Sequence, residues 1–133
     1  MTKTYYQQLS DLNVDFFERA KISLLDPLGL YLANDVKWIK TNQNWNHMKF
    51  PVVIGGKGQP ILLLHGFDSS FLEFRRIYQS LKRDFQVIVP DLLGFGFSPR
   101  CAVNEYNPSK IISYLVDLLK TLKIKENLKD RKS

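Results

Sequence analysis

The residues of this sequence that could carry out chemistry gather in two short segments, each directly after an apolar run. His65-Gly66-Phe67 follows the run from Ile61 to Leu64, and a glycine-rich segment from Asp91 to Ser98 follows the run from Phe85 to Val89. A histidine can act as a general base and a serine as a nucleophile, while glycines let backbone amides approach an anion closely. These two segments are therefore the candidate site.

The surrounding pattern predicts strands and helices that would bring the two segments together. Ile61 to Leu64 and Phe85 to Val89 are short apolar runs, typical of strands covered on both faces. Ser70 to Glu73 has the pattern of a capping box, in which the serine accepts from first-turn amides and the glutamate reaches back. Asn107-Pro108 begins a second helix that we expect to end near Ile124. This alternation predicts an α/β fold with both segments at the carboxyl edge of a parallel sheet.

Residues before position 55 are expected to form shorter elements. Between Ser10 and Trp45 we expect one or two short helices, broken near Asp26-Pro27 because the residue before proline disfavours the helical region. Val36 to Thr41 alternates apolar and polar residues, and Phe50 to Ile54 is a second short run, so both are predicted strands. We expect an N-terminal helical segment over residues 1–35, an α/β domain over residues 36–124 and a basic tail over residues 125–133.

Composition and charge exclude several classes of protein. The chain of 133 residues is 44% hydrophobic and 24% charged, which is typical of a globular protein and not of a disordered one. Net charge is +6, but residues 119–133 hold six basic and two acidic side chains, so a solvated tail is favoured over a nucleic-acid surface. The single cysteine, Cys101, allows no intramolecular disulfide, and no signal peptide or membrane-length apolar stretch is visible. We expect a soluble, cytoplasmic protein with neither nucleic acid nor membrane as partner.

The two segments, in this order and at this separation, resemble the α/β-hydrolase superfamily of the esterase, epoxide hydrolase and haloperoxidase type. P-I-L-L-L-H-G-F, residues 60–67, is similar to the family's third strand and His-Gly loop. V-I-V-P-D-L-L-G-F-G-F-S, residues 87–98, is similar to its fourth strand and Asp-x-x-Gly-x-Gly-x-Ser loop. The resemblance covers about residues 36–124. It implies a partial α/β-hydrolase fold, with the N-terminal strands and first two helices of a mostly parallel sheet, and hydrolysis of ester-like or related small substrates.

The resemblance also implies roles for particular residues. Phe67 N–H would be one donor of the oxyanion hole, which stabilises the negative charge that forms on the carbonyl oxygen during attack. Gly66 would let the backbone turn tightly beneath it. His65 would brace the loop without acting as the base, and Asp91 would pin the second loop against the first. The remaining residues that would support the second loop are Gly94, Gly96 and Ser98.

Other interpretations of the glycines and histidines are disfavoured. Gly94-Phe95-Gly96 lacks the third glycine of a dinucleotide fingerprint, because Pro99 stands at that position and no helix follows. The glycines of residues 55–58 precede a strand, so they indicate a turn and not a phosphate cradle. His47 is expected to be an ordinary surface or strand-edge histidine. No spacing of cysteines, histidines and carboxylates indicates a metal site, and we expect no cofactor.

The family's nucleophile motif, Gly-x-Ser-x-Gly or its aspartate equivalent, is not found in this sequence. In the family, the fifth strand leads to that nucleophile and pairs with the third strand, here Ile61 to Leu64. That fifth strand should begin just after the second helix, and the acid and the base should follow it. We therefore expect a truncated fragment that is inactive alone, with Ile61 to Leu64 left as an exposed edge.

Three hypotheses remain from the sequence. The favoured one is a hydrolase-family half, inactive by itself, that a split or truncated gene has left. In the second, a separately encoded C-terminal half completes the enzyme non-covalently, and only then does a small-molecule substrate react. In the third, the chain is a non-catalytic interaction module that binds a partner, or associates with itself, through the exposed strand Ile61 to Leu64 and the aromatic N-terminal region.

Overall fold

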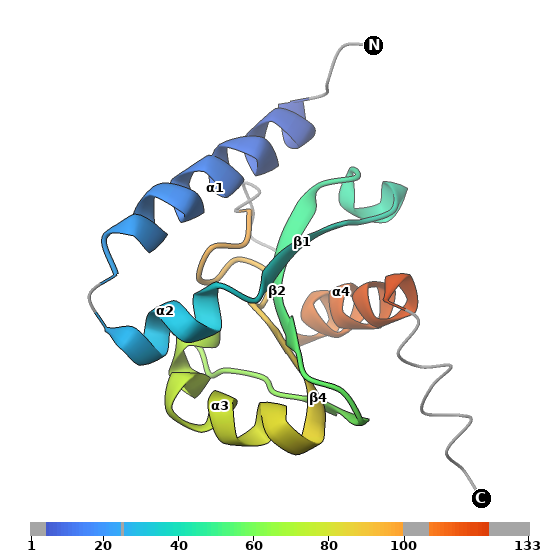
Figure 1. Ribbon diagram of the computed structural model, residues 1–133. Helices are drawn as coiled ribbons and strands as arrows, with labels where there is room; N and C mark the ends of the chain where they lie inside the picture. The colour runs from blue at the N-terminus through green and yellow to red at the C-terminus, as the bar shows by residue number, and fades with distance from the viewer. Residues whose placement is uncertain (1–4, 25, 100–106, 123–133) are drawn as a thin grey trace, which may run out of the picture.

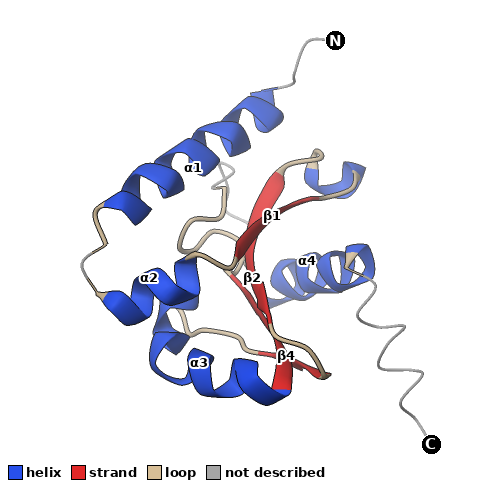
Figure 2. Cartoon of the chain, in the orientation of Figure 1, coloured by secondary structure: helices blue, strands red, loops and turns tan. Residues whose placement is uncertain are grey.

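The described part of the chain, residues 5–24, 26–99 and 107–122 of the computed structural model, forms one sheet with helices on both faces (Figures 1 and 2). The sheet has four strands in the order β1-β2-β4-β3. Helices α1, α2 and α3 cover one face, and α4 covers the other. The strands are β1 (Val36–Lys40), β2 (Lys49–Gly55), β3 (Gln59–Leu62) and β4 (Phe85–Pro90).

Helices α2 and α4 each begin after a residue that caps them. Asp26 caps α2 by accepting from Leu28 N–H at 3.0 Å, so the predicted break at Asp26-Pro27 is confirmed. Asn107 caps α4 in the same way, accepting from Lys110 N–H at 2.8 Å. The helical elements are α1 (Tyr5–Ile22), α2 (Pro27–Ala33), η1 (Gln43–Trp45), η2 (Phe71–Phe74), α3 (Arg75–Asp84) and α4 (Pro108–Thr121), where η marks a 3₁₀ turn. No helix of the described residues is both long and apolar enough to cross a membrane.

The sheet is mixed, which differs from the mostly parallel sheet expected from the sequence. β1 pairs antiparallel with β2, β2 pairs antiparallel with β4, and only β3 and β4 run parallel. The connection from β1 to β2 is short, and a short connection can only join antiparallel strands. A parallel pair needs a longer crossover, which η2 and α3 provide between β3 and β4. The α/β class is confirmed, and its parallel part is the pair of strands that precedes the candidate site.

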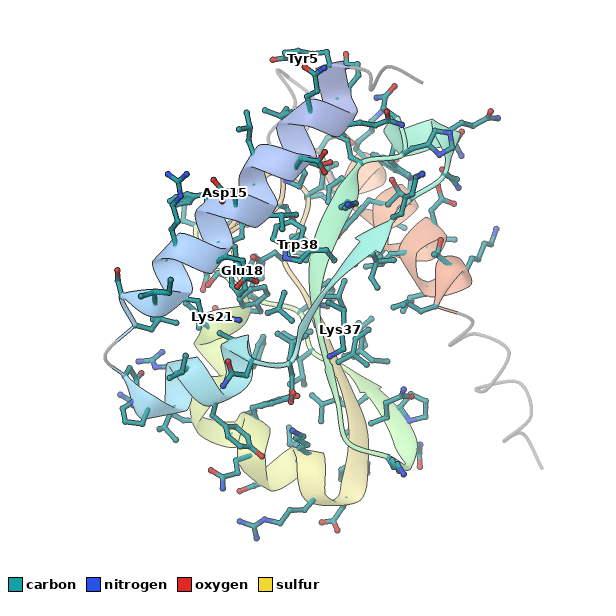
Figure 3. The ribbon with its side chains drawn as sticks, turned by 45° about the horizontal axis from the view of Figure 1, so that its top comes forward. Tyr5, Asp15, Glu18, Lys21, Lys37 and Trp38 are labelled. Carbon is teal, nitrogen blue, oxygen red and sulfur yellow. The ribbon has the colours of Figure 1, made fainter. Side chains whose placement is uncertain are left out.

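Two cores lie on opposite faces of the sheet because successive side chains of a strand point to opposite sides. On one face, Phe50 and Val52 of β2 pack with Tyr114 of α4. On the other face, Val53 packs with Phe17 of α1 and with residues of α2 and α3. The N-terminal helices therefore share a core with the sheet. Figure 3 shows Trp38 of β1 beneath α1, where its ring lies 6.0 Å from that of Phe17.

β3 is an edge strand in the described chain, where its only partner is β4. The strand ends at Leu62, although Leu63 N–H still donates to Ile88 O at 3.0 Å. Leu62 and Leu64 are 37% and 45% exposed. The expectation of a run covered on both faces is therefore wrong for β3 in the described residues, while the same expectation is correct for Val87, Ile88 and Val89 of β4, which are fully buried.

Candidate functional site

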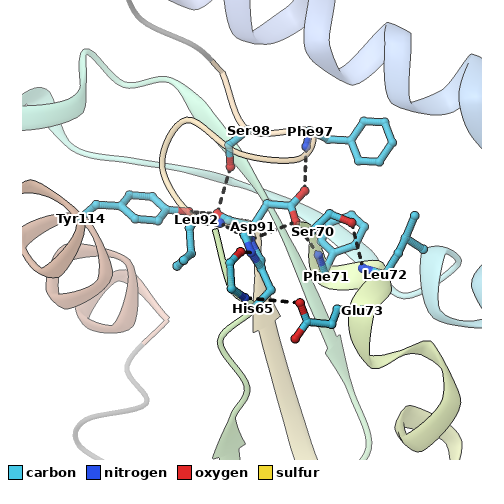
Figure 4. A network of polar contacts seen from close by, with 11 residues as sticks. His65, Ser70, Phe71, Leu72, Glu73, Asp91, Leu92, Phe97, Ser98 and Tyr114 are labelled. Atoms are coloured by element: carbon cyan, nitrogen blue, oxygen red, sulfur yellow. Dashed lines mark hydrogen bonds and ion pairs between the residues drawn. The ribbon is translucent and has the colours of Figure 1, made fainter. Parts of the chain in front are cut away.

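The candidate site consists of two loops that lie side by side because they follow parallel, paired strands. The first loop, His65–Ser70, leaves β3, and the second loop, Asp91–Ser98, leaves β4. Figure 4 shows the polar contacts that join them. The structure thus brings together all of the site residues expected from the sequence, and Asp91 lies at the centre of their contacts.

The carboxylate of Asp91 is fully buried and holds two backbone donors. Its Oδ1 accepts from Phe71 N–H at 2.7 Å, and its Oδ2 accepts from Phe97 N–H at 2.7 Å. Hydrogen bonds to an ionised acceptor are short and strong, and they compensate for the burial of the charge. Asp91 therefore joins the beginning of η2, just beyond the first loop, to the end of the second loop.

Gly96 lets the second loop close around that carboxylate. Its φ is +56°, in the left-handed region that favours glycine, and a Cβ atom at this position would lie 2.4 Å from Asp91 Oδ2. Gly94 also has a left-handed φ, of 85°. The backbone conformation therefore favours glycine at both positions. At position 96 there is also no room for a Cβ atom.

The backbone carbonyl of Asp91 is held from a different side. Ser98 Oγ donates to it at 3.0 Å, and Tyr114 Oη of α4 donates to it at 3.1 Å. Burial raises the pKa of Tyr114 well above its usual value, so this hydroxyl stays a neutral donor. Tyr114 was not among the residues expected at the site. Its spacing from Ile111 and Leu118 on the buried face of α4 is the sequence signal that points to it.

His65 is buried between the two loops, and both of its ring nitrogens are engaged. Leu92 N–H donates to Nε2 at 3.0 Å, so Nε2 carries no proton. The proton is therefore on Nδ1, which lies 2.7 Å from Gly66 O and donates to it. The 3.7 Å separation of Nε2 from Asp91 Oδ1 is longer than a hydrogen bond. In this arrangement neither nitrogen of His65 is free to take a proton from a nucleophile.

The contact from His65 to Gly66 O also sets the direction of Phe67 N–H. The Gly66 carbonyl and Phe67 N–H belong to one planar trans peptide, so they point in opposite directions. Because the carbonyl turns toward His65, the N–H turns away from it. No group of the described residues accepts a hydrogen bond from Phe67 N–H. The Phe67 side chain is 71% exposed, and its ring lies 5.5 Å from that of Phe95.

Gly66 differs from the expectation of a tight turn. Its φ is not positive, and a Cβ atom added there would meet nothing within 4 Å. The left-handed residue of the first loop is Asp68, with φ 58°. In this structure neither space nor a left-handed φ requires glycine at position 66.

An open cleft of about 900 Å³ lies beside this loop and reaches the second one. Its lining mixes polar and apolar side chains from both loops and from the start of α3, among them Asp68, Ser69, Glu73 and Phe95. Such a hollow at the carboxyl ends of parallel strands is where open α/β sheets bind ligands. Among the described residues, no group of three or more histidines, cysteines and carboxylates is placed to hold a metal ion.

The second loop is also in contact with α1, which sequence reasoning did not connect with the site. Asn13 Nδ2 donates to Phe97 O at 3.1 Å. The Phe97 ring lies 5.0 Å from that of Phe17 and stacks on that of Phe71 at 5.9 Å. An aromatic contact between segments so distant in sequence has no local sequence signal.

Comparison with known proteins agrees with this geometry. The family described as alpha/beta hydrolase fold matches residues 59–129, more than half of the chain. The chain belongs to the α/β-hydrolase fold family. The match includes β3, β4 and both loops of the candidate site, so the partial hydrolase fold expected from the sequence is confirmed.

Individual relatives cover the same part of this hydrolase-fold chain. The 2-hydroxymuconate semialdehyde hydrolase of Pseudomonas sp. (strain CF600) is 32% identical over 74 residues, which are 53% of this chain and 26% of that protein. The cis-3-alkyl-4-alkyloxetan-2-one decarboxylase of Shewanella oneidensis is 34% identical over 85 residues, 62% of this chain and 27% of that protein. A solved structure of metagenomic epoxide hydrolases from hot environments has a TM-score of 0.59 and 28% identity, over 67% of this chain and 30% of that one. The chain spans about a quarter of the length of the two curated relatives.

Proposed function

We propose that this chain supplies the oxyanion-binding part of an α/β-hydrolase active site that acts on ester-like or related small substrates. The single observation that carries the proposal is Phe67 N–H, which has no acceptor in the described chain and directly precedes residues 68–70, which line the cleft. The direction of Phe67 N–H is fixed by the hydrogen bond that His65 Nδ1–H donates to Gly66 O. A fixed, unoccupied donor is what stabilises a developing oxyanion, because it needs no reorganisation when the charge forms.

The chemistry divides between residues that this chain has and residues that it lacks. Attack on a carbonyl carbon moves an electron pair onto the carbonyl oxygen, and Phe67 N–H would donate to that oxygen. One such donor contributes about 3 kcal/mol to transition-state stabilisation. The sequence has no Gly-x-Ser-x-Gly or Gly-x-Asp-x-Gly motif, and both nitrogens of His65 are engaged. We propose that these 133 residues alone are inactive and that further polypeptide, joined or separate, supplies the nucleophile, the acid and the base.

The edge of β3 is the place where that further polypeptide would join. A strand added there would pair with the unpaired side of β3 and cover Leu62 and Leu64. The same edge supports a second candidate function, a non-catalytic module that binds a partner strand. The two candidates differ in what the added strand brings with it, since only a hydrolase segment carries a nucleophile.

The test uses p-nitrophenyl acetate and two substitutions at one position. The 133-residue chain alone should show no turnover above a boiled control, and turnover that a serine-directed phosphonate abolishes would contradict the proposed inactivity. The chain should then be fused to the remaining C-terminal part of the Pseudomonas semialdehyde hydrolase, from its fifth strand onward. In that fusion Phe67→Pro, which removes the N–H, should lower kcat by about 10²- to 10³-fold. Phe67→Ala, which keeps the N–H, is the matched control and should change kcat by less than about fivefold.

Equal kcat values for Phe67→Pro and Phe67→Ala would exclude Phe67 N–H as the donor. A fusion that folds and shows no hydrolysis would exclude the hydrolase candidate and leave the interaction module. Far-UV circular dichroism of each variant shows whether it has kept its fold, so a loss of structure is not mistaken for a loss of the donor.

A further inference from the structure

We propose that Glu73 is a positioning residue of the first loop, whose carboxylate holds the donors on either side of Phe67. The proposal rests on the function proposed above in one respect, because the loop matters for catalysis only if Phe67 N–H binds the oxyanion. The contacts themselves do not depend on that function, so the two can fail separately.

Glu73 lies on η2 and reaches back to the loop. Its Oε1 accepts from Gly66 N–H at 3.3 Å, and its carboxylate also accepts from the Ser69 hydroxyl. Figure 4 shows this carboxylate next to the segment that begins at His65. Gly66 directly precedes Phe67, and Ser69 follows two residues after it. One side chain therefore holds the loop on both sides of its exposed tip.

The contact at Gly66 complements the one made by His65. Glu73 fixes the peptide that joins His65 to Gly66, whereas His65 fixes the peptide that joins Gly66 to Phe67. A glycine between two peptides leaves both dihedral angles free unless each peptide is held. With both held, Phe67 N–H keeps one direction, and loss of either contact releases it.

The start of the helix does not need Glu73, which leaves its carboxylate available for the loop. The capping box expected from the sequence forms only in part: Ser70 Oγ accepts from Leu72 N–H at 3.1 Å, but Glu73 extends past Ser70 to Gly66. The neighbouring Arg75 does not compete for Glu73. Its Nε donates to Asp26 at 2.7 Å, and its guanidinium also donates to Leu72 O at 3.1 Å. Across residues 5–24, 26–99 and 107–122, no lysine or arginine forms an ion pair with Glu73.

The pH dependence of these contacts follows from the direction of the pKa shift. The Ser69 hydroxyl, and after it Gly66 N–H, hold the pKa of Glu73 below its ordinary value of 4.5. A carboxyl group whose pKa is lowered by folding gives its full contribution above that ordinary value, and the contribution is lost as pH falls through the lowered pKa. The loop should therefore be held at neutral pH and released in acid.

The first experiment follows the backbone amides of Gly66 and Phe67 by ¹⁵N NMR in the full 133-residue chain. In the unsubstituted chain both signals should move with a titration of Glu73 that lies below its ordinary pKa of 4.5. Glu73→Gln, which keeps an acceptor oxygen without the charge, should remove the titration and leave the neutral-pH signals near their original positions. Glu73→Ala should displace both signals and raise amide exchange at Gly66 by about fivefold. Glu18→Gln on α1, where Glu18 pairs with Lys21 at 3.3 Å, is the matched control and should leave both amides unchanged.

The second experiment measures kcat and KM in the fusion with the hydrolase segment. Glu73→Ala should lower kcat by about three- to tenfold with KM unchanged, because the donor acts in the transition state, and Glu73→Gln should restore most of the loss. If the amide signals of Gly66 and Phe67 do not change in Glu73→Ala, the positioning role is refuted, whatever the activity of the variant. Amides that respond while Phe67→Pro leaves kcat unchanged would support the positioning role and refute the proposed function.

Discussion

After β4, the chain turns through Asp91–Ser98 around a buried carboxylate. After β3, it turns through His65–Ser70 with the side chain of Phe67 in solvent. The second loop is held from within, by Asp91 and by the hydroxyl of Tyr114 from the opposite layer of the fold. The first loop is held by one buried histidine and, from the outside, by Glu73.

The second loop supports the site through buried contacts, whereas the first loop exposes a backbone donor, Phe67 N–H. Most buried polar groups in proteins are paired, and in the second loop the carboxylate and the carbonyl of Asp91 are hydrogen-bonded to the loop itself, to η2 and to α4. The first loop leaves Phe67 N–H without an acceptor in the described chain, at low cost because the tip is open to water. Under the proposed function, a donor to the substrate would have to be left free in this way, while His65 and Glu73 hold the peptides next to it.

The largest effect is expected for Asp91→Ala. The substitution leaves Phe71 N–H and Phe97 N–H buried without their acceptor, and it should lower the free energy of unfolding by about 3–5 kcal/mol. Urea unfolding followed by circular dichroism measures this loss. Asp15→Ala removes an exposed i,i+4 pair with Arg19 and is the control, with a change within about 0.5 kcal/mol. A loss below about 1 kcal/mol for Asp91→Ala would show that the second loop is not organised by this carboxylate.

His65→Ala comes next, because the His65 side chain bonds to the backbone of both loops. The substitution removes the acceptor of Leu92 N–H and the donor to Gly66 O, and it should lower the free energy of unfolding by about 2–3 kcal/mol. It should also shift the ¹⁵N amide signal of Phe67, since the Gly66–Phe67 peptide is no longer fixed. If the signal of Phe67 stayed in place while stability fell, His65 would hold the second loop alone.

A smaller effect is expected for Tyr114→Phe and Ser98→Ala. Each removes one of two hydroxyl donors to the same oxygen, Asp91 O, so each alone should cost about 1 kcal/mol. The double substitution should cost more than the sum, because the two hydroxyls donate to the same buried oxygen. A double-mutant cycle measured by urea unfolding checks this, and strict additivity would argue against a shared role for the two hydroxyls.

The sequence predicted the parts of the site that depend on local pattern. The apolar runs before His65 and Asp91 predicted a strand close to each of β3 and β4, although β3 spans Gln59–Leu62 and only β4 is buried as such runs imply. The spacing of Tyr114 on α4 indicates that it is buried, but its hydrogen bond to Asp91 O could not be predicted, since it arises where α4 packs on the sheet. The reach of Glu73 past Ser70 was also missed, because a capping box and a contact with a preceding loop share one sequence pattern. The mixed pairing of the sheet depends on β2 lying between β1 and β4, which no local pattern specifies.

The smallest effect is expected for Gly66→Ala, and Gly96→Ala is its counterpart in the second loop. At Gly66 an added methyl group meets nothing within 4 Å and φ is not positive, so stability should change by less than about 0.5 kcal/mol. At Gly96 the methyl group would lie 2.4 Å from Asp91 Oδ2 with φ at +56°, so the same substitution should cost about 2 kcal/mol or more. Thermal unfolding of the two variants side by side measures the contrast. Equal losses of stability in the two variants would mean that the first loop is as tightly packed as the second. That result would contradict the distinction between a supporting second loop and an exposed first loop.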